Sequence, residues 1–310
     1  MAEDSPAISV VVPAFDEADA LAELVARVRA ALDPLGRAWE LVIVDDGSAD
    51  GTAPLLRRLA TEEPRLRIFA ARRRLGQTAA LKAGLARARG AVIVTMDADL
   101  QNPPEEIPRL LRALDAGADV VTGWRRRRRD RWISRRLPST LANAWIRRAT
   151  GIPIHDHGCA LKAYRRDLVD RVHLYGDHHR LLTAVCALHG ARVREVEVAH
   201  DPRRNGRSKY GAGRVLRVLA DVLAMQMLLR HRRRPSIWFL RLAAPLAIGT
   251  LAAAAASIIP FLAEHDPLSV VWVGAAMILG FGAASMAAAG FFAELLLRLE
   301  PSHLQTGGAL

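Results

Sequence analysis

The segment Ala91-Val92-Ile93-Val94-Thr95-Met96-Asp97-Ala98-Asp99 decides the fold class of this chain. It begins with a run of apolar and β-branched residues, which predicts a buried strand, and it ends with two carboxylates separated by one residue. Strands that are apolar throughout are typical of parallel sheets covered by helices on both faces. Ligands of such sheets bind beyond the carboxyl ends of the strands, so we expect Asp97 and Asp99 to lie at a binding site.

Predicted strands and helices alternate along the chain around this segment. The strands are expected at residues 8–13, 39–44, 66–71, 91–96 and 119–122. The helices are expected at residues 17–31, from residue 52 onward, at 77–88 and after Pro103-Pro104. This alternation predicts an α/β domain built on a mainly parallel sheet with helices on both faces.

Carboxylates follow three of the predicted strands. Besides Asp97 and Asp99, they are the pairs Asp16-Glu17 and Asp45-Asp46. Carboxylates repel phosphates unless a divalent cation lies between them, and their hard oxygen atoms suit Mg²⁺ or Mn²⁺. The sequence has no GxGxxG after the first strand and no GxxxxGK(S/T), which removes the main support for a dehydrogenase or a P-loop nucleotidase. The acidic groups therefore predict a metal-assisted diphosphate site.

A series of motifs runs in order along the chain. The motifs are residues 12–17 (VPAFDE), 44–52 (VDDGSADGT), 75–81 (LGQTAAL), 97–101 (DADLQ), 123–125 (GWR), 155–166 (HDHGCALKAYRR) and 203–210 (RRNGRSKY). This series resembles the inverting GT-A glycosyltransferases of family two, and within them the polyprenyl-phosphate group of dolichyl-phosphate mannose synthase and bactoprenol glucosyltransferase. The resemblance implies a GT-A, Rossmann-like fold. The Gln-x-x-Arg-Trp element of processive synthases is absent, which favours transfer of a single sugar.

The resemblance also implies a nucleotide site and a metal site. The residues that would surround the base and ribose of a UDP- or GDP-linked sugar are Pro13, Glu17, Asp45 and Asp46. Asp97 would contact the nucleotide, and Asp99 and Gln101, together with Asp97, would hold a Mg²⁺ or Mn²⁺ cofactor. One departure is Asp16, which stands where the group usually has Asn, but this change keeps a polar side chain at that position.

On the acceptor side, the resemblance implies a polyprenyl phosphate. The expected phosphate-binding residues are Arg125, Arg203, Ser208 and Lys209, and Asp156 lies where the group has an acceptor-side carboxylate. Asp156, Asp99 and Arg125 are therefore the expected catalytic residues. A phosphate monoester has a second pKa of about 6, so it is largely ionised at neutral pH and needs little help from a general base. Asp156 is then either that base or a group that orients the acceptor or organises arginines.

The chain has two uncharged runs that are each long enough to cross a membrane, at residues 242–263 and 268–293. The short polar stretch 264–267 between them predicts a hairpin. Arginines at 230 and 232–234 precede the first run, and Arg298 follows the second. The positive-inside rule places both ends of the hairpin in the cytoplasm. We therefore expect a multi-pass protein of the inner or plasma membrane with a cytoplasmic catalytic domain.

The expected domains follow from these features. They are a GT-A catalytic domain at 1–211, a juxtamembrane amphipathic helix at 212–235, a transmembrane hairpin at 236–298 and a cytoplasmic tail at 299–310. Within the first, residues 132–150 combine tryptophan with arginine, which is typical of a helix that lies at the membrane interface.

The charge distribution leaves other partners open. The net charge is +12, and residues 236–310 carry two arginines and four acids, so the positive charge belongs to residues 1–235. A basic face fits a lipid bilayer, a nucleotide or nucleic acid. A membrane-tethered nucleic-acid binder has no use for the acidic edge, so we expect no nucleic-acid partner. A membrane-anchored transferase with a soluble or different lipid acceptor is the alternative function, and a homo-oligomer is compatible with either.

Overall fold

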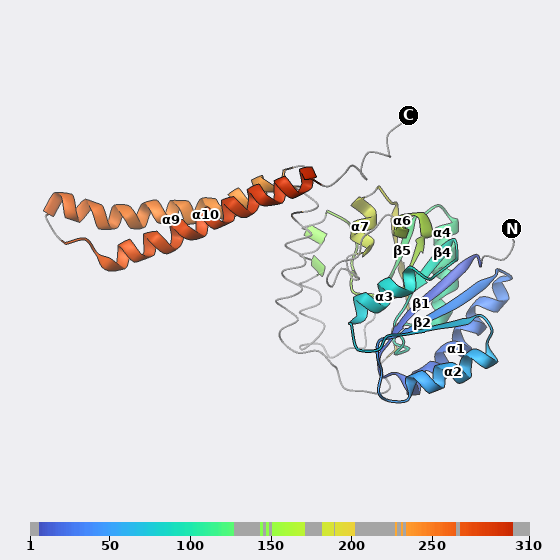
Figure 1. Cartoon of the computed structure of the whole chain (residues 1–310). Coiled ribbons are helices and arrows are strands. Elements are labelled where there is room, and N and C mark those ends of the chain that lie inside the picture. Colours follow the sequence, from blue (N-terminus) through green and yellow to red (C-terminus); the bar gives the residue numbers. More distant parts are fainter. Residues whose placement is uncertain are drawn as a thin grey trace. The chain divides into compact units, whose positions relative to one another are not determined.

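The computed structural model describes residues 6–126, 143–144, 147–148, 151–170, 182–188, 190–201, 227, 231, 234–264 and 267–299 (Figure 1). The chain divides into two compact units, Met1–Val222 and Leu223–Leu310. The expected interfacial helix at 132–150, juxtamembrane helix at 212–235 and tail at 299–310 lie mostly outside the described residues. Those boundaries stay predictions.

The described strands of the first unit form a seven-stranded sheet in the order β3-β2-β1-β4-β6-β5-β7. The strands are β1 (Ile8–Ala14), β2 (Trp39–Asp45), β3 (Leu66–Ala70), β4 (Val92–Thr95), β5 (Val120–Trp124), β6 (Lys162–Arg165) and β7 (Val193–Glu197). Strand β6 runs antiparallel to its neighbours β4 and β5, whereas the other pairings are parallel. The mainly parallel sheet is confirmed, and β6 and β7 are additions to the expected strands.

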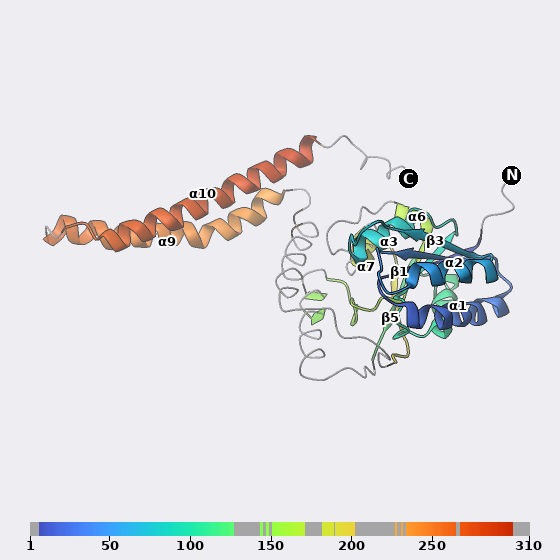
Figure 2. The same ribbon diagram turned by 60° about the horizontal axis from the view of Figure 1, so that its bottom comes forward.

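Helices cover both faces of the sheet. The described helices of this unit are α1 (Ala18–Leu32), η1 (Asp33–Leu35), α2 (Thr52–Glu62), α3 (Gln77–Leu85), η2 (Pro104–Glu106), α4 (Ile107–Asp115), α6 (Arg166–Asp170) and α7 (Leu182–Leu188). Figure 2 shows α1 and α3 on opposite sides of β1. Successive side chains of a strand point to opposite faces of the sheet. In β1, Val10 and Val12 therefore pack in one hydrophobic core and Val11 packs in the other.

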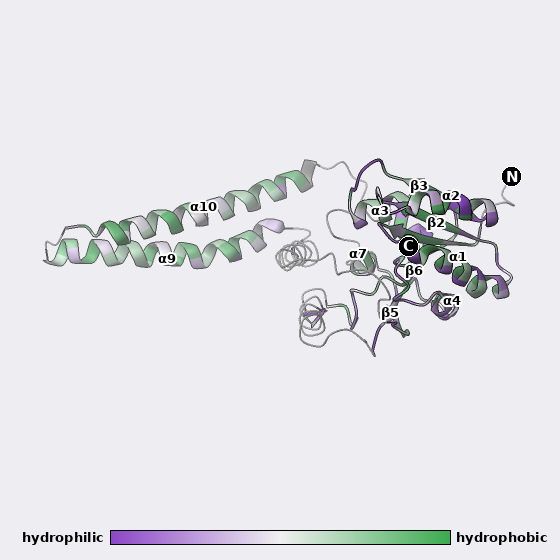
Figure 3. Ribbon diagram, turned by 90° about the horizontal axis from the view of Figure 1, so that it is seen from below, coloured by the Kyte–Doolittle hydropathy of each residue, from purple (hydrophilic) through white to green (hydrophobic). Residues whose placement is uncertain are grey.

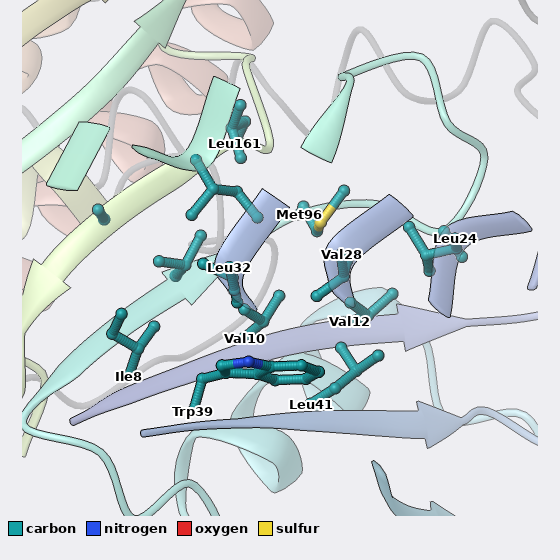
Figure 4. Close-up of a cluster of buried hydrophobic side chains, with 14 of the residues drawn as sticks. Ile8, Val10, Val12, Leu24, Val28, Leu32, Trp39, Leu41, Met96 and Leu161 are labelled. Carbon is teal, nitrogen blue, oxygen red and sulfur yellow. The ribbon is translucent and has the colours of Figure 1, made fainter. Parts of the chain in front are cut away.

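The first core packs α1, α2 and α4 against one face of the sheet. The apolar residues of α1 recur at helical spacing, so that Leu24, Val28 and Leu32 reach the same surface. Figure 4 shows these side chains above Val10, Val12, Trp39 and Leu41 from β1 and β2. The second core packs α3, α6 and α7 against the opposite face. Because all strands except β6 run in the same direction, their carboxyl ends lie at one edge of the sheet.

At the opposite edge of the sheet, where β1 and β2 begin, a buried carboxylate links the strands. This residue is Glu40, which is 2% exposed. Its oxygens accept hydrogen bonds from the Ser9 hydroxyl at 2.6 Å, from the Arg89 backbone N–H at 2.6 Å and from the Arg67 guanidinium at 2.9 Å. Burial alone would raise the pKa of Glu40, but these hydrogen bonds outweigh burial and lower it below the ordinary value of 4.5. The lowered pKa means that the ionised carboxylate stabilises the folded state.

Replacing Glu40 with alanine is expected to lower the free energy of unfolding by about 3 kcal/mol at neutral pH, because Ser9 and Arg89 lose their buried acceptor. A carboxyl group with a lowered folded-state pKa stabilises the fold above its ordinary pKa, and that contribution is lost as the pH falls through the folded-state value. The difference in unfolding free energy between wild type and the alanine variant should therefore narrow as the pH falls below the ordinary carboxyl pKa of 4.5. Thermal unfolding of the detergent-solubilised wild type and variant, at neutral pH and at a pH below 4.5, measures this difference.

The matched control for Glu40 is Glu62→Ala, since the Glu62 side chain is 63% exposed and lies 4.0 Å from Arg58. Its removal should change the unfolding free energy by no more than about 0.5 kcal/mol. Equal destabilisation by the two substitutions would contradict the role given to Glu40.

The second unit is a hairpin of two long helices, α9 (Pro235–Glu264) and α10 (Val270–Leu299). Each is long and apolar enough to cross a membrane, over Pro235–Ala263 and Val270–Leu296. The helices pack through small residues, since Gly280 faces Thr250 and Gly290 faces Phe239. Large apolar side chains such as Leu251, Val270 and Phe281 are exposed, and Figure 3 shows hydrophobic residues along both helices. The expected apolar hairpin is confirmed.

Candidate active site

The loops that follow β1 and β2 are joined by hydrogen bonds at the carboxyl edge of the sheet. The Asp16 N–H donates to the Ser48 hydroxyl at 2.8 Å, and the Asp16 carboxylate accepts from the Ala49 N–H at 2.9 Å. The Ala18 N–H donates to the Asp50 carboxylate at 3.1 Å. Asp16 has a φ of 51°, a left-handed conformation that few residues other than glycine adopt. The two loops therefore form one rigid wall beside Pro13 and Glu17, which are both half-buried.

Asp45 and Asp46 fix the shape of this wall from the end of β2. The buried Asp45 carboxylate accepts from the Ser48 N–H at 3.0 Å and from its hydroxyl at 2.5 Å. The two oxygens of Asp46 accept from the backbone N–H groups of Leu75 and Gly76, at 2.7 and 2.8 Å. These contacts tie the loop after β2 to the loop before α3. Contact of Pro13, Glu17, Asp45 and Asp46 with a nucleotide stays a prediction.

Gly47 shows how closely these loops approach each other. A Cβ atom at this position would lie 2.7 Å from the Arg73 carbonyl carbon and 2.8 Å from the Arg74 nitrogen, and the φ of Gly47 is 73°. Only glycine meets both conditions without a shift of the backbone. The motif at residues 44–52 therefore includes this glycine for a steric reason.

In the segment after β4, two half-buried carboxylates alternate with two buried apolar residues. Asp97 and Asp99 are half-buried, whereas Ala98 and Leu100 between and after them are buried in the first core. Leu100 has a φ of 56°, and this strained conformation lets the Gln101 N–H donate to the Asp99 carboxylate at 3.2 Å. The Gln77 side chain at the start of α3 donates to Asp97 at 2.8 Å.

These residues fit a hard divalent cation better than zinc. Asp97, Asp99 and Gln101 offer carboxylate and amide oxygens, which are ligands that Mg²⁺ and Mn²⁺ prefer. In the described part of the chain, no group of three or more His, Cys, Asp or Glu side chains is arranged to hold a metal. A structural zinc site needs about four such ligands, whereas Mg²⁺ is commonly held by one or two carboxylates, waters and substrate phosphates.

A second polar pair is formed by Arg125 and Asp156. The guanidinium of Arg125, which follows β5, donates to both oxygens of Asp156, at 2.7 and 3.0 Å. Asp156 is 2% exposed, and one of its oxygens also accepts from the Gly158 N–H at 3.2 Å. Burial works against the charged form of Arg125, but the hydrogen bond and charge of Asp156 outweigh burial and raise the pKa of Arg125. The charge of Asp97 acts in the same direction.

Further contacts join this pair to the edge that carries Asp97 and Asp99. The Thr95 hydroxyl at the end of β4 donates to the Ala160 carbonyl at 2.9 Å. The Asp201 N–H, after β7, donates to the Gln101 carbonyl at 2.9 Å. The expected phosphate-binding residues Arg203, Ser208 and Lys209 follow in sequence but lie outside the described residues. The structure therefore brings Asp97, Asp99, Gln101, Arg125 and Asp156 to one region.

Two residues without an expected role support the Asp156 segment. Lys162 is buried, and its ammonium group donates to the His157 carbonyl at 3.2 Å. Glu195 accepts hydrogen bonds from the backbone N–H groups of His155 and Asp156. Lys162 lies inside the motif at 155–166. It is one of only three lysines in the chain, and this rarity could have drawn attention to it in the sequence. Glu195 lies in no motif, so only the structure identifies it.

His157 lies buried between these groups. Burial, with the charge of Lys162, lowers the pKa of His157 to about 4, so its ring is neutral at physiological pH. Among the described residues, neither ring nitrogen has a hydrogen-bond partner.

Residues 9–172 match the family model described as Glycosyl transferase family 2, and the match covers more than half of the chain. The chain belongs to glycosyl transferase family 2. The expected family is confirmed.

Two curated glycosyltransferases are close in sequence. The dodecaprenyl-phosphate galacturonate synthase of Rhizobium johnstonii is 42% identical over 249 residues, which are 79% of this chain and 73% of that protein. The undecaprenyl-phosphate 4-deoxy-4-formamido-L-arabinose transferase of Pseudomonas paraeruginosa is 43% identical over 219 residues, which are 70% of this chain and 64% of that protein. The chain thus spans just under two thirds of the length of the second relative.

A solved glycosyltransferase shares the fold. The crystal structure of glucosyl-3-phosphoglycerate synthase from Mycobacterium tuberculosis, in complex with Mn²⁺, UDP and glucosyl-3-phosphoglycerate, superposes with a TM-score of 0.56 at 22% identity. The match covers 71% of this chain and 80% of that protein. At this identity the likeness shows the fold alone, and the expected GT-A fold class is confirmed.

Proposed function

We propose that this glycosyltransferase moves a single sugar, with inversion, from a UDP- or GDP-linked sugar to a polyprenyl phosphate at the cytoplasmic face of a membrane. The observation that carries the proposal is the position of the Arg125 guanidinium on the same edge as the half-buried carboxylates of Asp97 and Asp99. Such an edge can receive two anions, a diphosphate donor and a phosphate acceptor. The two curated relatives, whose names include dodecaprenyl phosphate and undecaprenyl phosphate, support the same acceptor class.

The donor would bind at the wall formed by the loops after β1 and β2. Pro13, Glu17, Asp45 and Asp46 would line the base and ribose there, and Asp97 would lie next to the diphosphate. Asp99, Asp97 and Gln101 would hold Mg²⁺ or Mn²⁺, which supplies positive charge to the departing diphosphate when it is bound. The hydrogen bonds of Asp46 to Leu75 and Gly76 keep this wall fixed before the donor arrives.

The acceptor would bind on the side of Arg125. The Arg125 guanidinium would offset the repulsion between the acceptor phosphate and the donor diphosphate. Arg203, Ser208 and Lys209 would assist it. Both oxygens of Asp156 already accept hydrogen bonds from Arg125. An ionised phosphate is itself the nucleophile and has no proton to lose to Asp156. We therefore infer that Asp156 orients Arg125 and does not act as the general base.

The hairpin of α9 and α10 would anchor the enzyme in the membrane. A basic flank at each outer end of the two spans supports a cytoplasmic position for both ends of the hairpin and for the catalytic unit. The phosphate of a polyprenyl phosphate lies at headgroup depth, where a membrane-anchored catalytic unit can reach it.

The test of this function is a scan of donors against acceptors. The purified full-length chain, with Mn²⁺, is given radiolabelled UDP- and GDP-sugars and either a short polyprenyl phosphate or the matching polyprenol. We expect label in the organic phase with one donor and only with the phosphorylated lipid. Label that moves to polyprenol, or no label in the organic phase with any donor, would contradict the proposal and favour the membrane-anchored transferase with another acceptor.

A further inference from the structure

The short segment 155–158, which carries Asp156, is held by Glu195 from β7. One Glu195 oxygen accepts from the backbone N–H of His155 at 2.7 Å and from the backbone N–H of Asp156 at 2.9 Å. The other oxygen lies 2.7 Å from Nδ1 of the His155 ring. The Glu195 side chain is 12% exposed, whereas the His155 side chain is 50% exposed, so the hydrogen bond to the Asp156 N–H is the more buried part of this contact. Hydrogen bonds to a charged carboxylate are stronger than those between neutral groups.

Glu195 links this segment to the strand that leads to Arg125. Strand β7 pairs in parallel with β5, and Glu195 lies opposite Thr122 in that register. Arg125 follows β5 directly. The backbone of Asp156 and the side chain of Arg125 are therefore fixed to neighbouring strands of the same sheet. From the other side, Lys162 holds the His157 carbonyl, so the segment is anchored before and after Asp156.

We propose that Glu195 is a positioning residue for sugar transfer, which fixes the Asp156 backbone so that both carboxylate oxygens meet the Arg125 guanidinium. The inference rests on the proposed function and deepens it, because it adds the group that sets the geometry of the acceptor-side pair. Glu195 lies beyond residues 9–172, which match the family model. Its effect on the reaction passes through Asp156 and Arg125, and it has no direct contact with substrate.

Two substitutions of Glu195 separate positioning from simple stability. Glu195→Gln keeps an oxygen that can accept both backbone N–H groups, whereas Glu195→Ala removes it. In the full-length chain, we expect Glu195→Ala to lower kcat/KM for the lipid phosphate by about 10²-fold, as a displacement near 1 Å would. The KM for the nucleotide sugar should stay within about twofold of wild type, since the donor wall is untouched. Glu195→Gln should recover most of the lost activity.

Hydrogen exchange provides a readout that does not depend on turnover. The amides of His155 and Asp156 should exchange faster in Glu195→Ala than in wild type, and they should regain protection in Glu195→Gln. The matched control is Glu197→Ala, on the same strand, whose carboxylate lies 3.6 Å from Arg126 and does not contact the 155–158 segment among the described contacts. It should leave both readouts unchanged.

A double substitution tests the route of the effect. If Glu195 acts only through Asp156, adding Glu195→Ala to Asp156→Ala should lower activity little further. Additive losses, full activity in Glu195→Ala, or equal defects in Glu195→Ala and Glu195→Gln would overturn the proposal. If Glu195→Ala does not fold, Glu195→Asp replaces it in the test, because this substitution shortens the side chain and retains its charge. Full activity in Glu195→Asp would also overturn the proposal.

The two proposals fail in different ways. A wild-type chain that moves no sugar to polyprenyl phosphate would refute the proposed function. The exchange rates of the His155 and Asp156 amides would still decide whether Glu195 holds the segment.

Discussion

Replacing Asp99 with alanine is expected to lower the rate of sugar transfer by about 10³-fold, which is the loss expected when charge stabilisation of a leaving group is removed. Asp99 is half-buried between the buried residues Ala98 and Leu100, and its carboxylate accepts a hydrogen bond from the Gln101 N–H. The substitution would remove one of the proposed oxygen ligands and leave Ala98 and Leu100 packed as before. The fold should therefore survive, and the loss should fall on the chemistry.

Two measurements together test the Asp99 prediction. The first is the initial rate of label transfer to the lipid over a range of Mn²⁺ concentrations. The second is Mn²⁺ binding to the chain in the presence of nucleoside diphosphate, followed by the electron paramagnetic resonance signal of free Mn²⁺. Both should be impaired in Asp99→Ala. A variant with normal Mn²⁺ binding and more than about a tenth of the wild-type rate would exclude Asp99 as a ligand.

The matched control for Asp99 is Asp115→Ala. Asp115 is the last residue of α4, its side chain is 59% exposed, and it pairs with Arg37 at 3.1 Å. An exposed ion pair contributes little, so the rate should stay within about twofold of wild type.

Replacing Arg125 with alanine is expected to reduce kcat/KM for the lipid phosphate by about 10²- to 10³-fold. The substitution would remove the cation that we propose offsets repulsion between the donor diphosphate and the acceptor phosphate. It also leaves the buried Asp156 carboxylate without the guanidinium that holds both its oxygens. Arg125→Lys keeps the charge but loses the two-pronged contact, so we expect it to remain about tenfold below wild type.

Steady-state kinetics of Arg125→Ala, of its double variant with Asp156→Ala and of Arg126→Ala distinguish the two possible roles of Asp156. If Asp156 works by orienting Arg125, then Arg125→Ala with Asp156→Ala should be no slower than Arg125→Ala alone. If Asp156 is a general base, the double variant should be slower by at least about another tenfold. The neighbouring Arg126→Ala, whose side chain is 63% exposed, should change the rate by less than about threefold.

The strands could be predicted where the sequence is apolar without interruption. Expected strands at 8–13 and 39–44 correspond to β1 and β2, which each continue one residue further. Strand β6 could not be predicted, because it is four residues long and begins and ends with charged residues, Lys162 and Arg165. It forms because β4 and β5 leave a space between them that its backbone fills, which is a tertiary effect.

The residues of the candidate site could be predicted better than their contacts. The motifs supply Asp97, Asp99, Arg125 and Asp156, and parallel strands explain why acidic groups distant in sequence share one edge. The pairing of Arg125 with Asp156 spans 31 positions, and no local rule joins them. Glu195 lies further along the chain, on a five-residue strand in which Arg194, Glu195 and Glu197 are all charged, so the sequence does not set Glu195 apart from its neighbours. Its role depends on the register of β7 with β5.

The central claim is that one sugar is joined to the phosphate of a polyprenyl phosphate with inversion at the anomeric carbon. The most direct measurement is nuclear magnetic resonance of the lipid product made by the purified full-length chain from an isotopically labelled nucleotide sugar. The account predicts one sugar per lipid, joined through a glycosyl phosphate whose anomeric configuration is opposite to that of the donor. A product with retained configuration, or with several sugars on one lipid, would contradict it.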